Sequence, residues 1–475
     1  MLYVTSFFTD LRVNLTPLQE RLLDTNKYPR IREFQPASSD RTRKSCEKKR
    51  GQMSQMYVQK IQQIRDALSA AGASGALLST QDNIFYASGF SSVMDGWHLM
   101  EPIAAVFVPT DAALPVLLIL PEASIISLIV SARAGHPVYY EGIATFELLN
   151  FCETARAEDA HLALPEDLLT ELGQVMARVE GHCEPDIIQT VAATLSRHLQ
   201  KDERVLFDDL RVAAHVESHS GQKTGDALEV MLASRVIKTA EELDTLRESG
   251  AIADDIMTYT LSQLSIGATW ADVEKAVAQY MVSRDVDPLP GSPMLFGGAY
   301  DLVFRPDLFR TRVNRPFSGG EVAILETQGR YKNFWIDINR TAHIGPASDA
   351  YRDQYNAVRD TFDAISARLK PGVNTADICQ FKDIAAAQRL DPPEKLLVVA
   401  HSVGLVPLES PVRYPGTGLH GAREGFVVQP GMVISIDCLY FGSRLGPSHM
   451  ENVFIVNESG AEPLYQSTLD LVEVS

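Results

Sequence analysis

A series of apolar, β-branched runs, each interrupted by a carboxylate or an imidazole, dominates the chain between Glu326 and Glu451. Such runs are typical of buried strands. They comprise Glu321–Glu326, Phe334–Thr341, Leu396–His401, Gly431–Asp437 and His449–Val456. Burying several carboxylates together is unfavourable unless an opposite charge compensates them. A divalent metal ion is the simplest such charge, so the sequence predicts a metal site where these strands meet.

The order and spacing of these side chains resemble a known family. Ten residues separate Glu326 from Asp337, and His401 opens the motif His-Ser-Val-Gly-Leu. Asp437 ends Pro-Gly-Met-Val-Ile-Ser-Ile-Asp, and Glu451 lies in Met-Glu-Asn. This pattern resembles the pita-bread family of aminopeptidase P, prolidase, methionine aminopeptidase and creatinase, whose shared set is Asp, Asp, His, Glu, Glu. The resemblance covers about residues 57–470 and implies an α/β N-terminal creatinase-like domain followed by an α+β pita-bread catalytic domain.

The resemblance implies two divalent ions, of Mn, Fe, Co or Zn, held by Glu326, Asp337, His401, Asp437 and Glu451. Glu326 stands where the family has its first Asp, and Asp437 stands where it has a Glu. Both remain carboxylates, so oxygen ligation is retained. Because one side chain is a methylene longer and the other a methylene shorter, we expect the ions to shift toward one side of the cavity. The alternative is a metal-free site, as in creatinase, which works with His and Glu residues.

Two histidines of the peptidase branch are missing from this chain. The branch has one before its first ligand strand, where this chain carries Tyr300 and Arg305 as candidate substrate-binding residues. The branch motif His-x-x-Gly-Leu-x-x-His-Glu-x-Pro retains Glu409 here but has Leu408 in place of its second histidine. These departures predict a specialised substrate, or a different route for protons, compared with ordinary Xaa-Pro cleavage.

Three residues are candidates for the chemistry itself. His449 lies two residues before Glu451, so on a strand its imidazole faces the same side. It is interpreted as an acid/base group or a contact for a substrate carboxylate, with a structural hydrogen bond as the alternative. Glu409 or His449 is predicted to pass a proton to the leaving nitrogen. His420, in the Gly416–Gly425 loop, is a candidate for closing over the site.

Residues of the N-terminal half are further candidates. In creatinase-like dimers this domain reaches over the partner's active site, so the resemblance implies a homodimer and makes Trp97 and His98 candidates for closing the substrate pocket. The alternative is aromatic packing at a domain junction. His215 and His219 have helical metal-ligand spacing but no adjacent acid, which favours a structural role.

The domain organisation follows from patterning. Residues 1–52 are predicted to be a poorly ordered extension, because Ser38–Arg50 is polar, mostly basic and without hydrophobic period. Residues 53–220 then form the N-terminal domain, beginning with a helix over 54–71, and residues 221–475 form the pita-bread domain. Thr239 and Glu242 predict a capping box at the start of its first helix.

Composition excludes several classes of function. The net charge of −18 argues against nucleic acid or an anionic membrane as a partner. The most apolar run, Pro115–Val130, is too short to span a bilayer. Five cysteines without a CxxC pair favour a reducing cytoplasm, and Asp10 and Arg12 interrupt any signal-peptide core.

The leading prediction is a metal-dependent hydrolase that cleaves an amide or C–N bond in a small molecule or an Xaa-Pro dipeptide. One alternative is a lyase, because Asn83–Ala87, Trp97 and Phe107–Pro109 resemble the dimethylsulfoniopropionate lyase of this fold. Pro407 departs from that lyase, which has an acidic residue there. Further alternatives are a metal-free, creatinase-like amidinohydrolase and a non-catalytic pita-bread domain used for binding.

Overall fold

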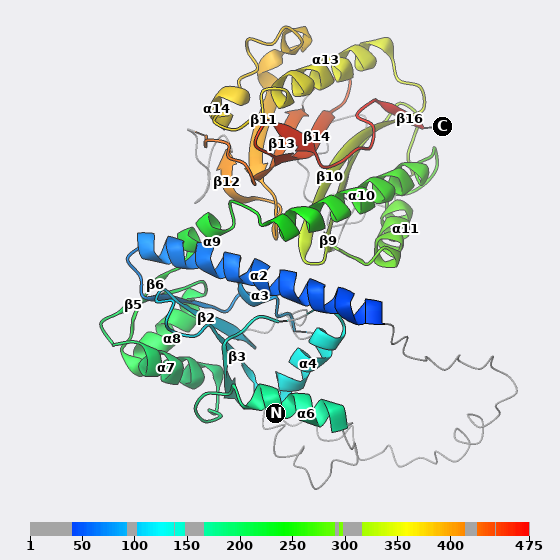
Figure 1. The fold of residues 1–475 in the computed structure, drawn as a ribbon. Coiled ribbons are helices and arrows are strands. Elements are labelled where there is room, and N and C mark those ends of the chain that lie inside the picture. Colours follow the sequence, from blue (N-terminus) through cyan, green and yellow to red (C-terminus); the bar gives the residue numbers. More distant parts are fainter. Residues whose placement is uncertain are drawn as a thin grey trace, which may run out of the picture. The chain divides into compact units, whose positions relative to one another are not determined.

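The structure is a computed structural model that describes residues 40–92, 102–136, 138–147, 166–289, 294–297, 316–413, 425–441 and 443–474. The chain divides into two units, Met1–Lys49 and Arg50–Ser475. Of the predicted extension over residues 1–52, residues 1–39 lie outside the described part. Two lobes, each built on its own β-sheets, belong to the second unit (Figure 1).

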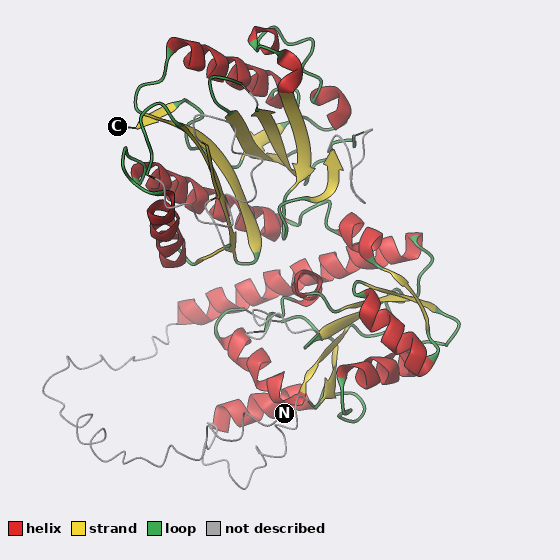
Figure 2. Cartoon of the chain, turned by 180° about the vertical axis from the view of Figure 1, so that it is seen from behind, coloured by secondary structure: helices red, strands yellow, loops and turns green. Residues whose placement is uncertain are grey.

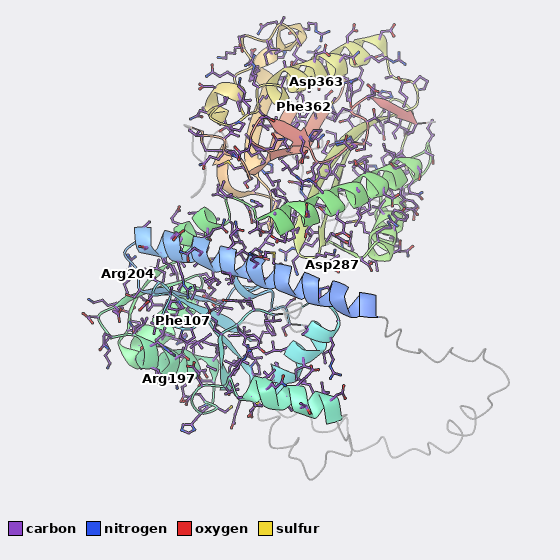
Figure 3. All side chains as sticks on the ribbon, in the orientation of Figure 1. Phe107, Arg197, Arg204, Asp287, Phe362 and Asp363 are labelled. Carbon is purple, nitrogen blue, oxygen red and sulfur yellow. The ribbon has the colours of Figure 1, made fainter. Side chains whose placement is uncertain are left out.

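A six-stranded mixed sheet forms the N-terminal lobe, in the order β4-β3-β2-β1-β5-β6. Its strands are β1 (Gly75–Leu78), β2 (Ala105–Pro109), β3 (Leu117–Pro121), β4 (Gly142–Phe146), β5 (Arg204–Phe207) and β6 (Lys223–Asp226). Its helices are α3 (Gln81–Ser88), α4 (Ile125–Arg133), α6 (Glu166–Met176), α7 (Ile187–His198), α8 (Leu210–Ser220) and α9 (Leu228–Ser234). Phe107 of β2 (Figure 3) is fully buried, and its ring lies 6.3 Å from that of His198 on α7. The lobe is therefore an α/β domain, as predicted.

The first helix, α2 (Asp40–Ala70), begins earlier than expected. The sequence predicted a helix from residue 54, preceded by a basic linker. That assignment was wrong, because the helix includes most of the basic stretch. Lys, Arg, Gln and Glu have high helix propensity even without an apolar face. The later turns of α2 bury side chains, among them Ile61, Ile64 and Leu68.

Within the described residues, the C-terminal lobe consists of two sheets covered by helices (Figure 2). One sheet contains β7 (Val286–Pro288), β8 (Met294–Gly297), β9 (Val322–Tyr331), β10 (Phe334–Ile344) and β16 (Val472–Val474). The other runs β12-β11-β13-β14-β15 and contains β11 (Leu396–Ser402), β12 (Glu409–Arg413), β13 (Val433–Tyr440), β14 (Ser448–Val456) and β15 (Ala461–Pro463). All five strands predicted to carry the metal-capable side chains are therefore confirmed.

The helices cover these sheets on their outer sides. Helix α10 (Ala240–Ser262) packs on β10 and against α11 (Trp270–Ser283), while α13 (Asp349–Ser366) packs on β13 and β14 (Figure 1). Phe362 of α13 (Figure 3) places its ring 6.3 Å from Phe454 of β14. Helix α10 begins with the predicted capping box between Thr239 and Glu242. Within the described residues, no helix combines the length and apolar character needed to cross a membrane.

Candidate metal centre

Strand register explains how residues far apart in the chain reach one place. In the β9–β10 hairpin, Glu326 pairs with Asn339 and Gln328 pairs with Asp337. In the second sheet, His401 pairs with Ser435 across β11 and β13, and Asp437 pairs with Glu451 across β13 and β14. Because side chains alternate along a strand, residues 435 and 437 share a face, as do 449 and 451. Each hairpin therefore presents its carboxylates on a single face.

The structure brings the five predicted ligands together and adds His449 to them. Ligand atoms of Asp337, His401 and Glu451 lie within 4.8 Å of one another, as do those of Asp437, His449 and Glu451. Nε2 of His401 is 3.2 Å from Oδ2 of Asp437, and Nε2 of His449 is 3.3 Å from Oδ1 of the same carboxylate. Glu326 joins the cluster through Oε2, which lies 3.8 Å from Nδ1 of His449.

Burial controls the charge of this cluster. Burial and the neighbouring Glu326 raise the pKa of Asp337 to about 7. Burial also raises the pKa of Glu326 and that of Glu451. Burial opposes the charged form of His401, but its contact with Asp437 outweighs this and raises the pKa of the imidazole to about 9. Burial likewise opposes ionisation of Asp437, but the two imidazoles outweigh it and hold its pKa at about 2.

The donor set fits a divalent metal. Glu451 is 1 % exposed, and its Oε2 has no hydrogen-bond partner among the described residues. Leaving such an oxygen buried and unpaired is costly, and a cation between these groups would remove that cost. Carboxylate oxygens with imidazole nitrogens are ligands that Mn, Fe, Co and Zn accept.

Supporting residues that the sequence did not reveal orient the carboxylates. Asn339 donates from Nδ2 to Oε2 of Glu326 at 2.6 Å, and Gln328 donates from Nε2 to Oδ1 of Asp337 at 3.2 Å. Ser435 donates to Oε1 of Glu451 at 3.1 Å. The backbone N–H of Asp337 donates to the hydroxyl oxygen of Tyr465 at 3.0 Å. Asn339, Gln328 and Ser435 each lie two residues from a ligand, so strand alternation was the signal that would have identified them.

Glu409 has different surroundings from those expected of a proton carrier. It is buried, with Oε2 3.0 Å from Nζ of Lys238 and Oε1 3.3 Å from Nε of Arg235. Burial alone would raise the pKa of Glu409, but these two cations outweigh it and lower the pKa. The backbone N–H of Leu405 donates to the same carboxylate at 3.0 Å. A carboxylate held ionised in this way is poorly suited to exchange protons near neutral pH.

The other sequence candidates fall into two groups. Trp97, His98, Tyr300, Arg305 and His420 are outside the described residues. His215 and His219 are on α8, where they line a cavity of about 620 Å³ in the N-terminal lobe. Within the described part of the chain, both groups of three metal-capable residues are in the C-terminal lobe.

Metal binding should release more than one proton per chain at about pH 6.5. Burial raises the pKa of Asp337 to about 7, and the contact of His401 with Asp437 outweighs burial and raises the pKa of that imidazole to about 9, so at this pH both groups hold protons in the metal-free state. Ligation requires the deprotonated forms, so metal affinity should increase with pH through this range. Zinc titrations by calorimetry in two buffers of different ionisation enthalpy measure the number of protons released. An observed enthalpy that is identical in both buffers would contradict the prediction.

Comparisons with known proteins agree with a metal centre in the C-terminal lobe. Residues 244–458 match the family model of metallopeptidase family M24. An uncharacterized peptidase, YqhT, from Bacillus subtilis is 25% identical over 245 residues, which cover 50% of this chain and 64% of the relative. A probable dipeptidase, PepE, from Mycobacterium tuberculosis is 26% identical over 253 residues, which cover 52% of this chain and 63% of the relative. The matched segment thus spans slightly less than two thirds of these relatives' length.

Solved structures share the fold over most of the chain. Dipeptidase PepE from Mycobacterium ulcerans superimposes with a TM-score of 0.63 at 19% identity, covering 89% of this chain and 98% of that structure. A prolidase from Thermococcus sibiricus gives a TM-score of 0.65 at 15% identity, covering 88% of this chain and 99% of that structure. The predicted two-domain, pita-bread fold is confirmed. The lyase alternative has no support among these relatives.

Proposed function

We propose that this chain is a metal-dependent hydrolase that cleaves the amide bond of dipeptide-type small substrates, because its residues 244–458 match the model of metallopeptidase family M24. The observation that carries the proposal is the buried cluster of four carboxylates and two imidazoles in the C-terminal lobe. The relatives named as dipeptidases and prolidases support a substrate such as an Xaa-Pro dipeptide.

We further propose that the centre holds two ions. Glu451 belongs to both groups of metal-capable residues, which makes it suited to contact both ions. Asp337 and His401 complete the first group, and Asp437 and His449 complete the second. Glu326 adds a carboxylate held in place by Asn339. When bound, the ions would polarise the scissile carbonyl and lower the pKa of a water molecule toward neutrality.

The chain's own residues would orient the centre. Ser435, Asn339 and Gln328 fix the carboxylate oxygens by hydrogen bonds, as supporting groups around metal sites commonly do. Glu409, on this proposal, is a positioning residue. Its carboxylate accepts a hydrogen bond from the backbone N–H of Leu405. The carbonyl oxygen of Gly404, the residue before Leu405, accepts from the backbone N–H of Trp335 at 2.7 Å. Glu409 therefore stabilises the segment that joins His401 to the strand of Asp337.

The cellular setting is also proposed. The chain has five cysteines and no CxxC pair, which supports the cytoplasmic location expected from the sequence. The homodimer remains a proposal drawn from the family resemblance, and the molar mass from light scattering in solution tests it.

Removing metal should abolish hydrolysis. A sample stripped with a chelator and dialysed should lose at least about 99% of its turnover on Xaa-Pro dipeptides, because the carboxylate cluster alone supplies neither the electrophile nor the activated water. Turnover should return when Mn²⁺, Co²⁺ or Zn²⁺ is added, and Mg²⁺ serves as the control ion. Full turnover by the stripped enzyme would favour a metal-free, creatinase-like mechanism, and tight metal binding without turnover on any dipeptide would favour a binding domain.

A further inference from the structure

His449 is directed at the candidate metal centre with both of its ring nitrogens. It lies on β14 two residues before Glu451, on the same face, and its side chain is buried. Nε2 is 3.3 Å from Oδ1 of Asp437, and Nδ1 is 3.8 Å from Oε2 of Glu326. A histidine buried for packing needs one partner for its N–H. Here the two nearest carboxylates are themselves members of the centre.

The carboxylate of Asp437 lies between two imidazoles. Its Oδ2 is 3.2 Å from Nε2 of His401, and its Oδ1 is 3.3 Å from Nε2 of His449. Neighbouring ligands bonded at about 2.0–2.2 Å to a tetrahedral or octahedral ion lie about 2.8–3.6 Å apart. The separations on both sides of Asp437 therefore match those of neighbouring ligands on an ion. His449 has the same relation to this carboxylate as His401.

We propose that His449 is a metal ligand of this chain, so that each of two ions has one imidazole. His401 serves the group with Asp337 and Glu451, and His449 serves the group with Asp437 and Glu451. The inference rests on the proposed metal centre and adds a second nitrogen donor to the five ligands expected from the sequence.

The second imidazole changes which metals the centre prefers. Imidazole suits Zn, Co and Ni, whereas an all-oxygen site suits Mn and Mg. With His449 as a ligand, both positions carry nitrogen, so both should favour Zn²⁺ and Co²⁺ over Mn²⁺. Without it, only the ion held by His401 would show that preference.

Counting imidazoles in the wild-type chain tests the proposal without any substitution. The full-length protein is stripped, loaded with two equivalents of Zn²⁺ and measured by X-ray absorption at the zinc edge. One imidazole on each ion predicts an average of about one per zinc. A single ligating histidine would give an average of about one half, and that result would overturn the proposal.

Variants provide the second test. Stripped His449→Gln should bind one Co²⁺ as tightly as wild type and the other more than about 100-fold more weakly, a larger loss than the 10–100-fold that follows when a partner of a ligand is removed. Its visible cobalt spectrum should change accordingly. His343→Gln is the matched control, because His343 is an equally buried strand histidine whose Nδ1 lies 2.8 Å from the carbonyl oxygen of Gly345. Its affinities and spectrum should equal those of wild type.

The outcomes separate this inference from the proposed function. Wild-type affinity for both ions and an unchanged spectrum in His449→Gln would overturn the ligand role while leaving the metal centre intact. If His449→Gln binds both ions as tightly as wild type but turns over more slowly, His449 is instead assigned to proton transfer. A stripped wild-type chain that binds no Co²⁺ or Zn²⁺ would overturn both the centre and the inference.

Discussion

Replacing Asp337 with alanine should lower kcat/KM on a cleaved dipeptide by at least about 10²–10³-fold, the usual effect of removing one preorganised group from an active site. Asp337 shares a metal-capable group with His401 and Glu451, so its loss removes a ligand and leaves the remaining groups unable to hold an ion in place. Activity should fall together with metal content, which elemental analysis of the purified variant measures.

The same variant should remain folded. The structural contact of Asp337 with Tyr465 is made by its backbone N–H, which alanine retains, and the substitution relieves repulsion from Glu326. The thermal midpoint of the metal-free variant should therefore equal or exceed that of metal-free wild type. Asp287→Ala is the matched control, because Asp287 is an exposed aspartate in the same sheet (Figure 3). Full turnover by Asp337→Ala would mean that the cluster is not the reacting centre.

The sequence predicted the ligand strands because charged side chains rarely interrupt apolar, β-branched runs without a compensating partner. Asp337 and Glu451 stand out in such runs, and strand alternation placed His449 on the face of Glu451. The hydrogen bond from Asn339 to Glu326 was not predicted, because it depends on the register of β9 against β10. Register is fixed by the hairpin and by burial, which single-residue patterns do not specify.

Glu409 illustrates a different limit. The motif around it suggested a proton carrier, yet its partner Lys238 is 171 residues away in the chain. No local pattern connects the two, and only the fold brings them together. The early start of α2 differs, because the helix propensity of Lys, Arg and Glu is a local property of the sequence. These residues show no hydrophobic period, which is the main pattern that indicates a helix.

Glu409→Ala should destabilise the chain by about 3–5 kcal/mol, the cost of breaking a buried ion pair by removing one partner. Its carboxylate is the ion-pair partner of both Lys238 and Arg235, which are 6 % and 8 % exposed. After the substitution these two cations would stay buried with their positive charge uncompensated. Urea unfolding followed by fluorescence and circular dichroism measures the change in the free energy of unfolding.

Matched variants distinguish the buried ion pairs of Glu409 from an ordinary surface ion pair. Glu462→Ala removes the partner of Arg247 at an ion pair in which both side chains are about half exposed, so it should cost about 0–1 kcal/mol. The double variant Lys238→Met/Glu409→Gln should regain part of the loss, because it removes one of the two buried cations that Glu409→Ala leaves uncompensated. If Glu409→Ala costs no more than Glu462→Ala but still abolishes turnover, the positioning role is wrong and the carboxylate acts directly in proton transfer. If stability and turnover fall together, and the double variant restores part of both, Glu409 acts by holding the segment between His401 and Asp337.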